Sequence, residues 1–206
     1  MHILLASASP RRRELIEQIG WSEEICPASF DEAATEKEVK ERIALEEDTL
    51  QEKFSHFHGA DLVTLFNAYG KGKAVLLEKG AALPVVAADT VVVLEEKVLG
   101  KPKDEEGAKA MLHLLSGKAH EVKTGLSVFY KGEVYLHVET TKVYFRELTE
   151  KEITWYVSTG EPADKAGAYG IQGKGAVLVK KIEGSYDNVV GLPLTALYEI
   201  LVVSGQ

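Results

Sequence analysis

Cysteine is almost missing from this chain of 206 residues, in which Cys26 is the only one. No disulfide can form within the chain, so we expect a reducing compartment. Long hydrophobic runs are missing as well. No stretch approaches the ~20 apolar residues of a membrane span, and the run at residues 3–6 is too short for the core of a signal peptide. These absences favour a cytoplasmic protein with no membrane partner.

Positive charge is also scarce. The 24 Lys and Arg residues are outnumbered by 32 Asp and Glu residues, which gives a formal net charge of -8. Broad nucleic-acid binding needs a basic face, so we expect no nucleic-acid partner. The deficit still allows a small anion to bind in a local basic pocket. With 45% hydrophobic and 27% charged residues, the composition is that of a globular protein large enough for one domain or two small lobes.

Strand-like and helix-like segments alternate along most of the chain. Strands are predicted at residues 2–6, 83–94, 121–130, 134–145 and 176–182, and helices at residues 10–19, 61–77, 104–115, from 149 onward and at 193–203. The two strands on either side of residues 131–133 are expected to form a hairpin. This alternation, with one hairpin, indicates an α/β fold with a mixed sheet.

Three segments give weaker signals. Residues 35–53 are dense in Glu and Lys and poor in apolar residues, which indicates a solvent-exposed helix or a mobile insertion. The helix at 61–77 is expected to be interrupted by Gly70 and Gly72, because glycine is a poor helix former. Residues 185–193 have few apolar residues and are expected to form a loop.

The most informative stretch is SASPRRR at residues 7–13, directly after an apolar run. Ser9 suits a helix N-cap, and Pro10 suits the first helical position. Three arginines in a first helical turn are unfavourable, since that end of a helix carries partial positive charge. A phosphate among them would accept hydrogen bonds from backbone N–H groups, serine hydroxyls and guanidinium groups. The alternative interpretation is a solvated basic turn.

Asp89 interrupts the most apolar strand of the sequence, with Thr90 beside it. A buried carboxylate without a partner is costly. We therefore expect Asp89 to be paired, to bind a metal or to face a cleft at a strand end, and each of these is typical of a functional site. The alternative is an aspartate that merely caps a loop.

Two lysines and a glycine-rich loop are further candidates. Lys101 lies in a short loop between Gly100 and Pro102, and Lys71 lies between two glycines, so either suits phosphate neutralisation. In the loop at residues 164–175, the amide of Gln172 suits pairing with a nucleobase edge. Solvated loop lysines and a convoluted turn are the plainer interpretations.

An acidic residue and three histidines are more ambiguous. Glu32 is either a metal-facing carboxylate or a surface acid. His56 and His58 lack a surrounding framework of acids or cysteines, so a solvated pair is expected rather than a metal site. We expect His120 to be structural.

Taken together, these segments resemble the Maf family of nucleoside triphosphate pyrophosphatases. The matching motifs occur in the family's order and span nearly the whole chain: SASPRR at 7–12, ADT at 88–90, GKP at 100–102, EP at 161–162, DKAGAYGIQG at 164–173 and GLP at 191–193. The resemblance implies one domain over residues 1–206. Its fold would be a mixed twisted sheet in two lobes with a central nucleotide cleft, similar to inosine triphosphatase.

The resemblance also implies an activity and a set of site residues. It implies cleavage of a nucleoside triphosphate between its α and β phosphates, with a divalent metal (Mg²⁺ or Mn²⁺), by a protein that forms a homodimer. Asp89 would be the general base, and Arg11, Thr90 and Gln172 would mark the branch acting on dTTP and UTP. Further implied positions are Ser7, Ser9, Arg12, Lys71 and Lys101 for the substrate, and Glu32 together with Asp89 for the metal.

One departure and two alternatives accompany this resemblance. The stretch between Glu32 and Lys71 is longer than in typical members, which indicates an insertion within residues 33–66 and leaves the match of Lys71 open. The sister branch acting on methylated GTP is one alternative, against which Gln172 and Thr90 argue. A nucleotide-binding regulator of septum formation with little turnover is the other. The presence of Asp89, Lys101 and Arg11 together favours an enzyme, since a pure sensor needs no base.

Overall fold

The computed structural model describes residues 1–80 and 82–203. The strands are β1 (His2–Leu5), β2 (Ser22–Ile25), β3 (Val85–Leu94), β4 (Lys97–Leu99), β5 (Ala119–Tyr130), β6 (Glu133–Phe145) and β7 (Val179–Glu183). The α-helices are α1 (Pro10–Gln18), α2 (Glu36–Ile43), α3 (Asp48–Phe54), α4 (Gly59–Lys79), α5 (Glu105–Leu115), α6 (Glu150–Ser158), α7 (Tyr186–Val190) and α8 (Leu194–Tyr198). Short 3-10 helices at Glu161–Asp164, Ala166–Ala168 and Gly173–Leu178, and a π-helical turn at Glu199–Val203, complete the elements.

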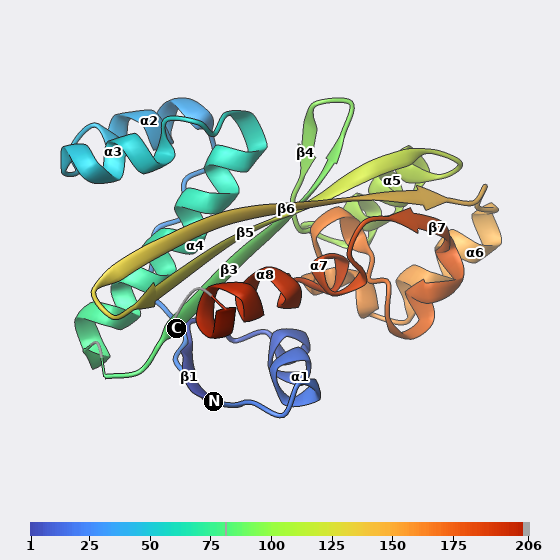
Figure 1. Cartoon of the computed structure of the whole chain (residues 1–206). Coiled ribbons are helices and arrows are strands. Elements are labelled where there is room, and N and C mark those ends of the chain that lie inside the picture. The colour runs from blue at the N-terminus through green and yellow to red at the C-terminus, as the bar shows by residue number, and fades with distance from the viewer. Residues whose placement is uncertain (81, 204–206) are drawn as a thin grey trace. The chain divides into compact units, whose positions relative to one another are not determined.

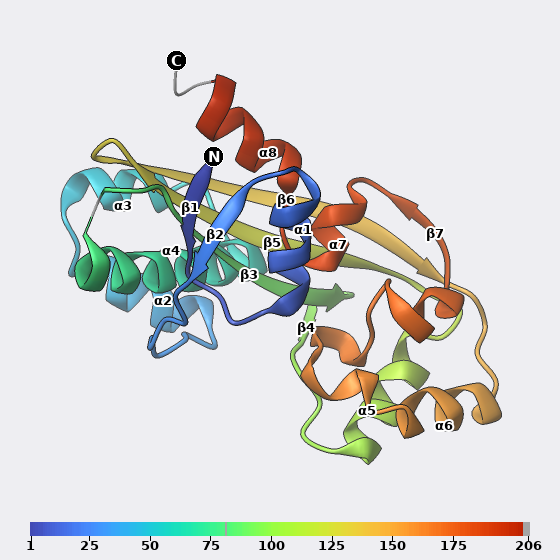
Figure 2. The same cartoon turned by 90° about the horizontal axis from the view of Figure 1, so that it is seen from below.

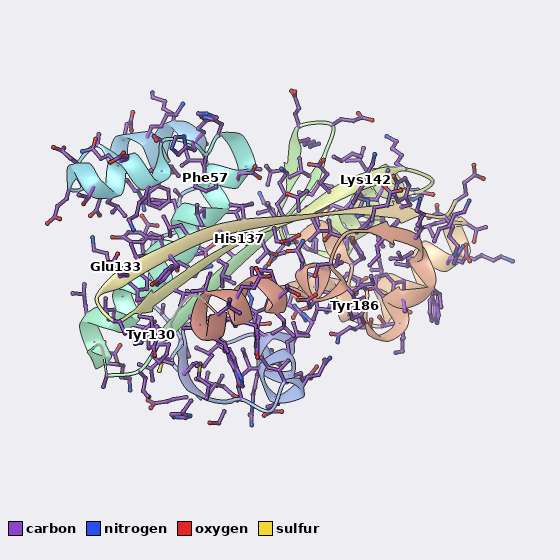
Figure 3. The ribbon with its side chains drawn as sticks, viewed as in Figure 1. Phe57, Tyr130, Glu133, His137, Lys142 and Tyr186 are labelled. Carbon is purple, nitrogen blue, oxygen red and sulfur yellow. The ribbon has the colours of Figure 1, made fainter. Side chains whose placement is uncertain are left out.

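The seven strands found among the described residues form one mixed sheet in the order β2-β1-β3-β5-β6-β7, with β4 paired to β3. β1 runs parallel to both β2 and β3, whereas β3–β4 and β6–β7 are antiparallel. The α/β fold with a mixed sheet is therefore confirmed. Strands β5 and β6 form the long hairpin that the sequence predicts, and Figure 3 labels Tyr130 and Glu133 at the ends of the two strands.

The chain divides into two compact units. The first comprises residues 1–89, 124–139 and 191–206, and the second comprises residues 90–123 and 140–190. The chain passes between the units within β3, β5 and β6 and once more directly after α7. In the first unit, the N-terminal strands β1 and β2 lie beside each other, as Figure 2 shows. Cys26 is buried there in a small apolar cluster, as expected of a cysteine that acts as a hydrophobic residue.

Helix α4 of the first unit is continuous through its glycines, so the expected interruption at Gly70 and Gly72 is wrong. A Cβ added at Gly70 would lie 2.1 Å from Cζ of Phe30, and one added at Gly72 would lie 2.5 Å from Cε2 of Phe129. The glycines leave room for two aromatic rings from other segments. Tertiary packing thus offsets their poor helix propensity.

Residues 35–53 form two helices rather than one. Helices α2 and α3 lie beside α4 in Figure 1, and each buries one apolar face in a shared cluster. Val39 and Ile43 contribute from α2, and Leu50 and Phe54 from α3. The partly buried ring of Phe57, in the connection to α4, packs against the same cluster (Figure 3). Few apolar residues are needed, because both helices are short.

The second unit contains most of the remaining predicted elements. Helix α5 begins at the N-cap Asp104, whose side chain accepts a hydrogen bond from the Gly107 amide at 2.7 Å. Helix α6, predicted from residue 149 onward, begins with a capping box of Thr149 and Glu152. The predicted strand at residues 176–182 begins later, at Val179, because a 3-10 helix precedes it.

One prediction near the C-terminus needs correction. The expected loop at 185–193 contains α7, whose start is marked by the Ser185 hydroxyl accepting a hydrogen bond from the Asn188 amide at 3.3 Å. The expected helix at 193–203 is confirmed, since α8 continues directly into the π-helical turn. In the part of the chain that the structure describes, no helix has the length and apolar character needed to cross a membrane.

Candidate functional site

Asp89 lies where the parallel pairing of β3 with β1 has ended. The last residue of β1, Leu5, pairs with Val86, and Asp89 follows three residues later on β3. Ligand sites of open α/β sheets form beyond the carboxyl ends of such strands. The Asp89 side chain is only 15% exposed, so its carboxylate needs a partner.

That partner is Lys71, on helix α4. Its Nζ lies 2.7 Å from Oδ1 of Asp89 and 2.8 Å from Oε1 of Glu32. Of the alternatives expected for Asp89, pairing of its carboxylate is the one that the structure shows. Lys71 and Glu32 therefore lie next to Asp89. In the sequence, only the family resemblance placed these two residues in the same site as Asp89.

The loop that carries Glu32 is attached to the same helix. The buried side chain of Asn67 forms two hydrogen bonds with the backbone of Ala33, and Phe30 packs over Gly70. Since Asn67 and Lys71 are four residues apart, they share one face of α4. One helical face therefore supplies both the lysine and the attachment of the acidic loop.

The basic motif joins residues from opposite ends of the chain. Arg12 donates from Nε to the Gly191 carbonyl at 2.7 Å and from Nη1 to the Ser7 hydroxyl at 3.0 Å. The Ser7 hydroxyl also accepts a hydrogen bond from the Ser9 amide at 3.2 Å. Gly191 has a φ of 125°, which favours glycine and explains this residue in the GLP motif.

Electrostatics tie Arg12 to the acidic group. Burial lowers the pKa of Arg12 from its ordinary value, while the charge of Asp89 raises it, that of Arg11 lowers it and that of Glu32 raises it. All four residues belong to the first unit. Within this unit, the carboxylates of Asp89 and Glu32 and the guanidinium group of Arg11 all lie close enough to Arg12 to change its pKa.

The three consecutive arginines divide by environment. Arg11 and Arg12 are partly buried, whereas Arg13 is exposed. Nε of Arg13 lies 2.8 Å from Oε1 of Glu17 and 3.1 Å from Oε1 of Glu23, so this side chain forms ion pairs on the surface of α1. Ser9 occupies the N-cap position, followed by Pro10, but its side chain forms no capping hydrogen bond.

Glu32 and Asp89 fit a divalent cation as carboxylate ligands, but they would need further ligands from the substrate or from water. The carboxylates of Glu32 and Asp89 converge on one ammonium group, so their oxygens face a common point. Mg²⁺ is typically held by one or two carboxylates together with substrate phosphates. Among residues 1–80 and 82–203 no group of three or more His, Cys, Asp or Glu side chains is placed to hold a metal alone. His56 and His58 are exposed and belong to no such group.

The second unit carries the other candidates: Thr90, Lys101 and Gln172. Lys101 is exposed in its loop, and Gln172 is partly buried. The loops of these two residues meet, because the Gly167 amide donates to the Gly100 carbonyl at 3.0 Å. A Cβ at Gly167 would lie 2.9 Å from Cγ2 of Val92, so glycine permits the close approach of this loop to β3.

An aromatic group supports the glycine-rich loop from within the second unit. The His120 ring lies edge-on to Phe145 and Tyr169, and its Nε2 is 2.7 Å from the Tyr169 hydroxyl. Burial lowers the pKa of His120 to about 4. Burial, and to a lesser degree Tyr156, raises the pKa of Tyr169. His120 is therefore neutral and structural, as expected.

Sequence reasoning missed the residues that hold the site in place. Asn67 and Phe30 carry no motif of their own, and neither does Arg42, which donates from Nη1 to the Asp31 carbonyl at 2.6 Å. The available signal for Asn67 is its position, because it is an amide within the apolar face of α4. For Gly191 the signal was its membership of the GLP motif, but its contact with Arg12 required the tertiary structure.

Comparison with known proteins identifies a matching protein family. The family model described as Maf-like protein matches residues 2–203. A protein of Agathobacter rectalis is 44% identical over 205 residues, which cover 97% of this chain and 95% of that protein. A protein of Carboxydothermus hydrogenoformans is 46% identical over 204 residues, with 98% and 97% covered. A Geobacillus protein is 46% identical over 193 residues, with 94% and 92% covered. Each of these three is named dTTP/UTP pyrophosphatase.

Proposed function

The chain belongs to the Maf family, and we propose that it hydrolyses dTTP and UTP to the monophosphate and pyrophosphate. The observation that carries this proposal is the group of Glu32, Lys71 and Asp89, with Arg12 in electrostatic range. It combines a carboxylate for proton transfer with cations for phosphate. The names of the similar proteins support the same activity and the same pyrimidine substrates.

Phosphate charge is the first problem that such an enzyme has to solve. A triphosphate repels an incoming nucleophile unless cations neutralise it. Arg11, Arg12 and Lys71 supply positive charge in the first unit, and the Ser7 and Ser9 segment lies at the start of α1. Lys71 is occupied by two carboxylates in the structure. Phosphate oxygens of the substrate would compete for its ammonium group and leave Asp89 available for proton transfer.

Asp89 is the proposed general base. The oxygen of a water molecule forms a bond to the α phosphorus while the bond from that phosphorus to the bridging oxygen breaks. Pyrophosphate leaves with the electron pair of that bond, and the water proton passes to the Asp89 carboxylate. Positioned bases of this kind typically contribute about 10²- to 10⁴-fold to a rate.

A divalent cation, Mg²⁺ or Mn²⁺, is proposed as the cofactor, held by Glu32 and Asp89. When bound, it supplies charge neutralisation at the phosphates.

We propose that the second unit selects the nucleobase of the substrate, because the amide of Gln172 offers both a hydrogen-bond donor and an acceptor. A nucleobase that leaves these groups unpaired is rejected, because buried polar groups without partners are costly. Lys101 and Thr90 are proposed to contact the substrate from the same unit.

Release of pyrophosphate from a nucleotide panel tests the proposal. The panel contains dTTP, UTP, ATP, GTP and methylated GTP, each with Mg²⁺ or Mn²⁺, and Asp89→Asn serves as the inactive comparison. Turnover of dTTP and UTP above the purine nucleotides is expected. Binding of dTTP and UTP without turnover would overturn the enzymatic role, and equal turnover of methylated GTP would overturn the pyrimidine specificity.

A further inference from the structure

We propose that Asn67 is a positioning residue, which fixes the loop of Glu32 beside Lys71, and that Arg42 assists it from helix α2. This inference rests on the proposed function, since it concerns how the Glu32 carboxylate is placed for metal and substrate. All of the residues involved belong to the first unit.

The contact of Asn67 with the loop is bidentate. Its Oδ1 accepts a hydrogen bond from the Ala33 amide at 2.9 Å, and its Nδ2 donates to the Ala33 carbonyl at 3.0 Å. Asn67 is 4% exposed and Ala33 is 3% exposed, so water does not replace these bonds easily. One buried side chain thus pairs with both backbone groups of the residue that follows Glu32.

Phe30 holds the other side of the same loop. Its ring occupies the space that a side chain would take at Gly70, and it lies 6.0 Å from the ring of Phe66, centre to centre. Asn67 and Gly70 are three residues apart on α4, and Lys71 is adjacent. The two attachments of the loop and the lysine that receives Glu32 therefore share one short length of helix.

Arg42 fixes the residue just before Glu32. It donates from Nη1 to the Asp31 carbonyl at 2.6 Å and from Nη2 to the Asp31 carboxylate at 2.8 Å. Arg42 also pairs with Glu38, one turn earlier on α2. Helix α2 belongs to the stretch in which the sequence indicates an insertion, and this contact gives that helix a role in bracing the acidic loop.

Glu32 itself has little else to hold it. Its side chain is 54% exposed, and its ion pair is with Lys71. The placement of the carboxylate therefore depends on the backbone on either side of Glu32. Arg42 hydrogen-bonds to this backbone at Asp31, and Asn67 hydrogen-bonds to it at Ala33. Residues that orient a ligand or catalytic group typically affect activity or metal affinity by about 10- to 100-fold when replaced.

Hydrogen exchange tests the attachment without relying on activity. Asn67→Ala is expected to raise the exchange rate of the Ala33 amide at least about tenfold, because the amide loses a buried acceptor. Arg42→Gln, a change at a partly exposed position, is expected to raise exchange at residues 31–33 a few-fold. Thr64→Ala is the control. It removes a different buried polar group of α4, a hydroxyl that donates to the Ala60 carbonyl within the helix, and should leave exchange at residues 30–34 unchanged.

Kinetics then test the link to Glu32. Both Asn67→Ala and Arg42→Gln are expected to lower kcat/KM for dTTP and raise the metal concentration giving half-maximal rate, by about tenfold or more for Asn67→Ala. In a Glu32→Gln background, Asn67→Ala should add less than about twofold, because the group it positions has been removed. Thr64→Ala should leave both quantities unchanged.

The outcomes separate this inference from the proposed function. Unchanged exchange at Ala33, or a full effect of Asn67→Ala on top of Glu32→Gln, would overturn the positioning role. A wild-type protein that releases no pyrophosphate would overturn the proposed function, while the exchange measurement would still decide whether Asn67 and Arg42 hold the loop. If Asn67→Ala does not fold, Asn67→Ser, which shortens the side chain but keeps a polar group, carries the test at Ala33, and Arg42→Gln tests the attachment at Asp31.

Discussion

The ammonium group of Lys71 lies 2.7 Å from the Asp89 carboxylate, and the two side chains are each only 15% exposed. Helix α4 supplies the lysine and strand β3 supplies the aspartate, 18 residues later. A weakly solvated pair of this kind is costly to break from one side, since the remaining charge keeps its desolvation. The second contact, from Lys71 to Glu32, makes the lysine the common partner of two acids.

Replacement of Asp89 tests its proposed role as the general base directly. Asp89→Asn keeps the shape of the side chain but cannot accept a proton at neutral pH, so pyrophosphate release from dTTP should fall by about 10²- to 10⁴-fold. Asp104→Asn is the matched control. Asparagine caps a helix about as well as aspartate does, and Asp104 caps α5, so this variant should retain full activity. A loss of less than tenfold in Asp89→Asn would contradict the assignment.

Replacement of Lys71 should affect both activity and stability. Lys71→Met removes the common partner of Glu32 and Asp89, so kcat/KM should fall and the free energy of unfolding should decrease by about 3 kcal/mol. Lys73→Met is the control, because Lys73 lies on the same helix and pairs with Glu46 in a more exposed setting. Exposed pairs contribute at most about 1 kcal/mol. Equal losses in the two variants, measured by urea denaturation and pyrophosphate release, would contradict the central place of Lys71.

Local patterns account for the elements that were predicted well. Apolar runs located β1 and β3, a short turn located the β5–β6 hairpin, and the Thr149–Glu152 pair located the start of α6. Each of these signals lies within a few residues. An ion pair at Asp89 was one of the alternatives that the local sequence indicated, because a carboxylate within an apolar strand is costly without a partner.

Long-range contacts account for what was missed. Helix α4 continues through Gly70 because Phe30, 40 residues earlier, fills the space beside it. Arg12 is held by Gly191, 179 residues later. Neither contact has a signature in the segments concerned. The position of Lys71 between its two acids likewise depended on how α4 packs.

The contact between Gly70 and Phe30 yields a stability test. In a helix, Gly→Ala usually stabilises by roughly 0.5–1 kcal/mol. In Gly70→Ala the new Cβ would lie 2.1 Å from Phe30 Cζ, so the free energy of unfolding should instead fall by about 1–3 kcal/mol. In a Phe30→Ala background the same change should become stabilising. Urea denaturation of the four proteins measures this coupling, and equal effects of Gly70→Ala in both backgrounds would rule out the contact.

The buried His120 makes stability depend on pH. Burial lowers the pKa of His120 from 6.5 to about 4 in the folded protein, so between these values the unfolded chain binds the extra proton. The free energy of unfolding therefore rises with pH across this window. The contribution of His120 is fully present above pH 6.5 and is lost as pH falls towards 4, by up to about 3 kcal/mol.

A nontitrating variant isolates this contribution from that of the carboxylates. His120→Asn replaces the imidazole by an amide, which keeps a polar group near the Tyr169 hydroxyl, and should be less stable than the wild type at pH 7 because it packs less well beside Phe145. On acidification from pH 6.5 to pH 4 it should lose less stability than the wild type does. His56→Asn, at an exposed position between α3 and α4, should follow the wild-type curve. Parallel curves for His120→Asn and the wild type would show that His120 does not remain neutral in the folded protein over this range.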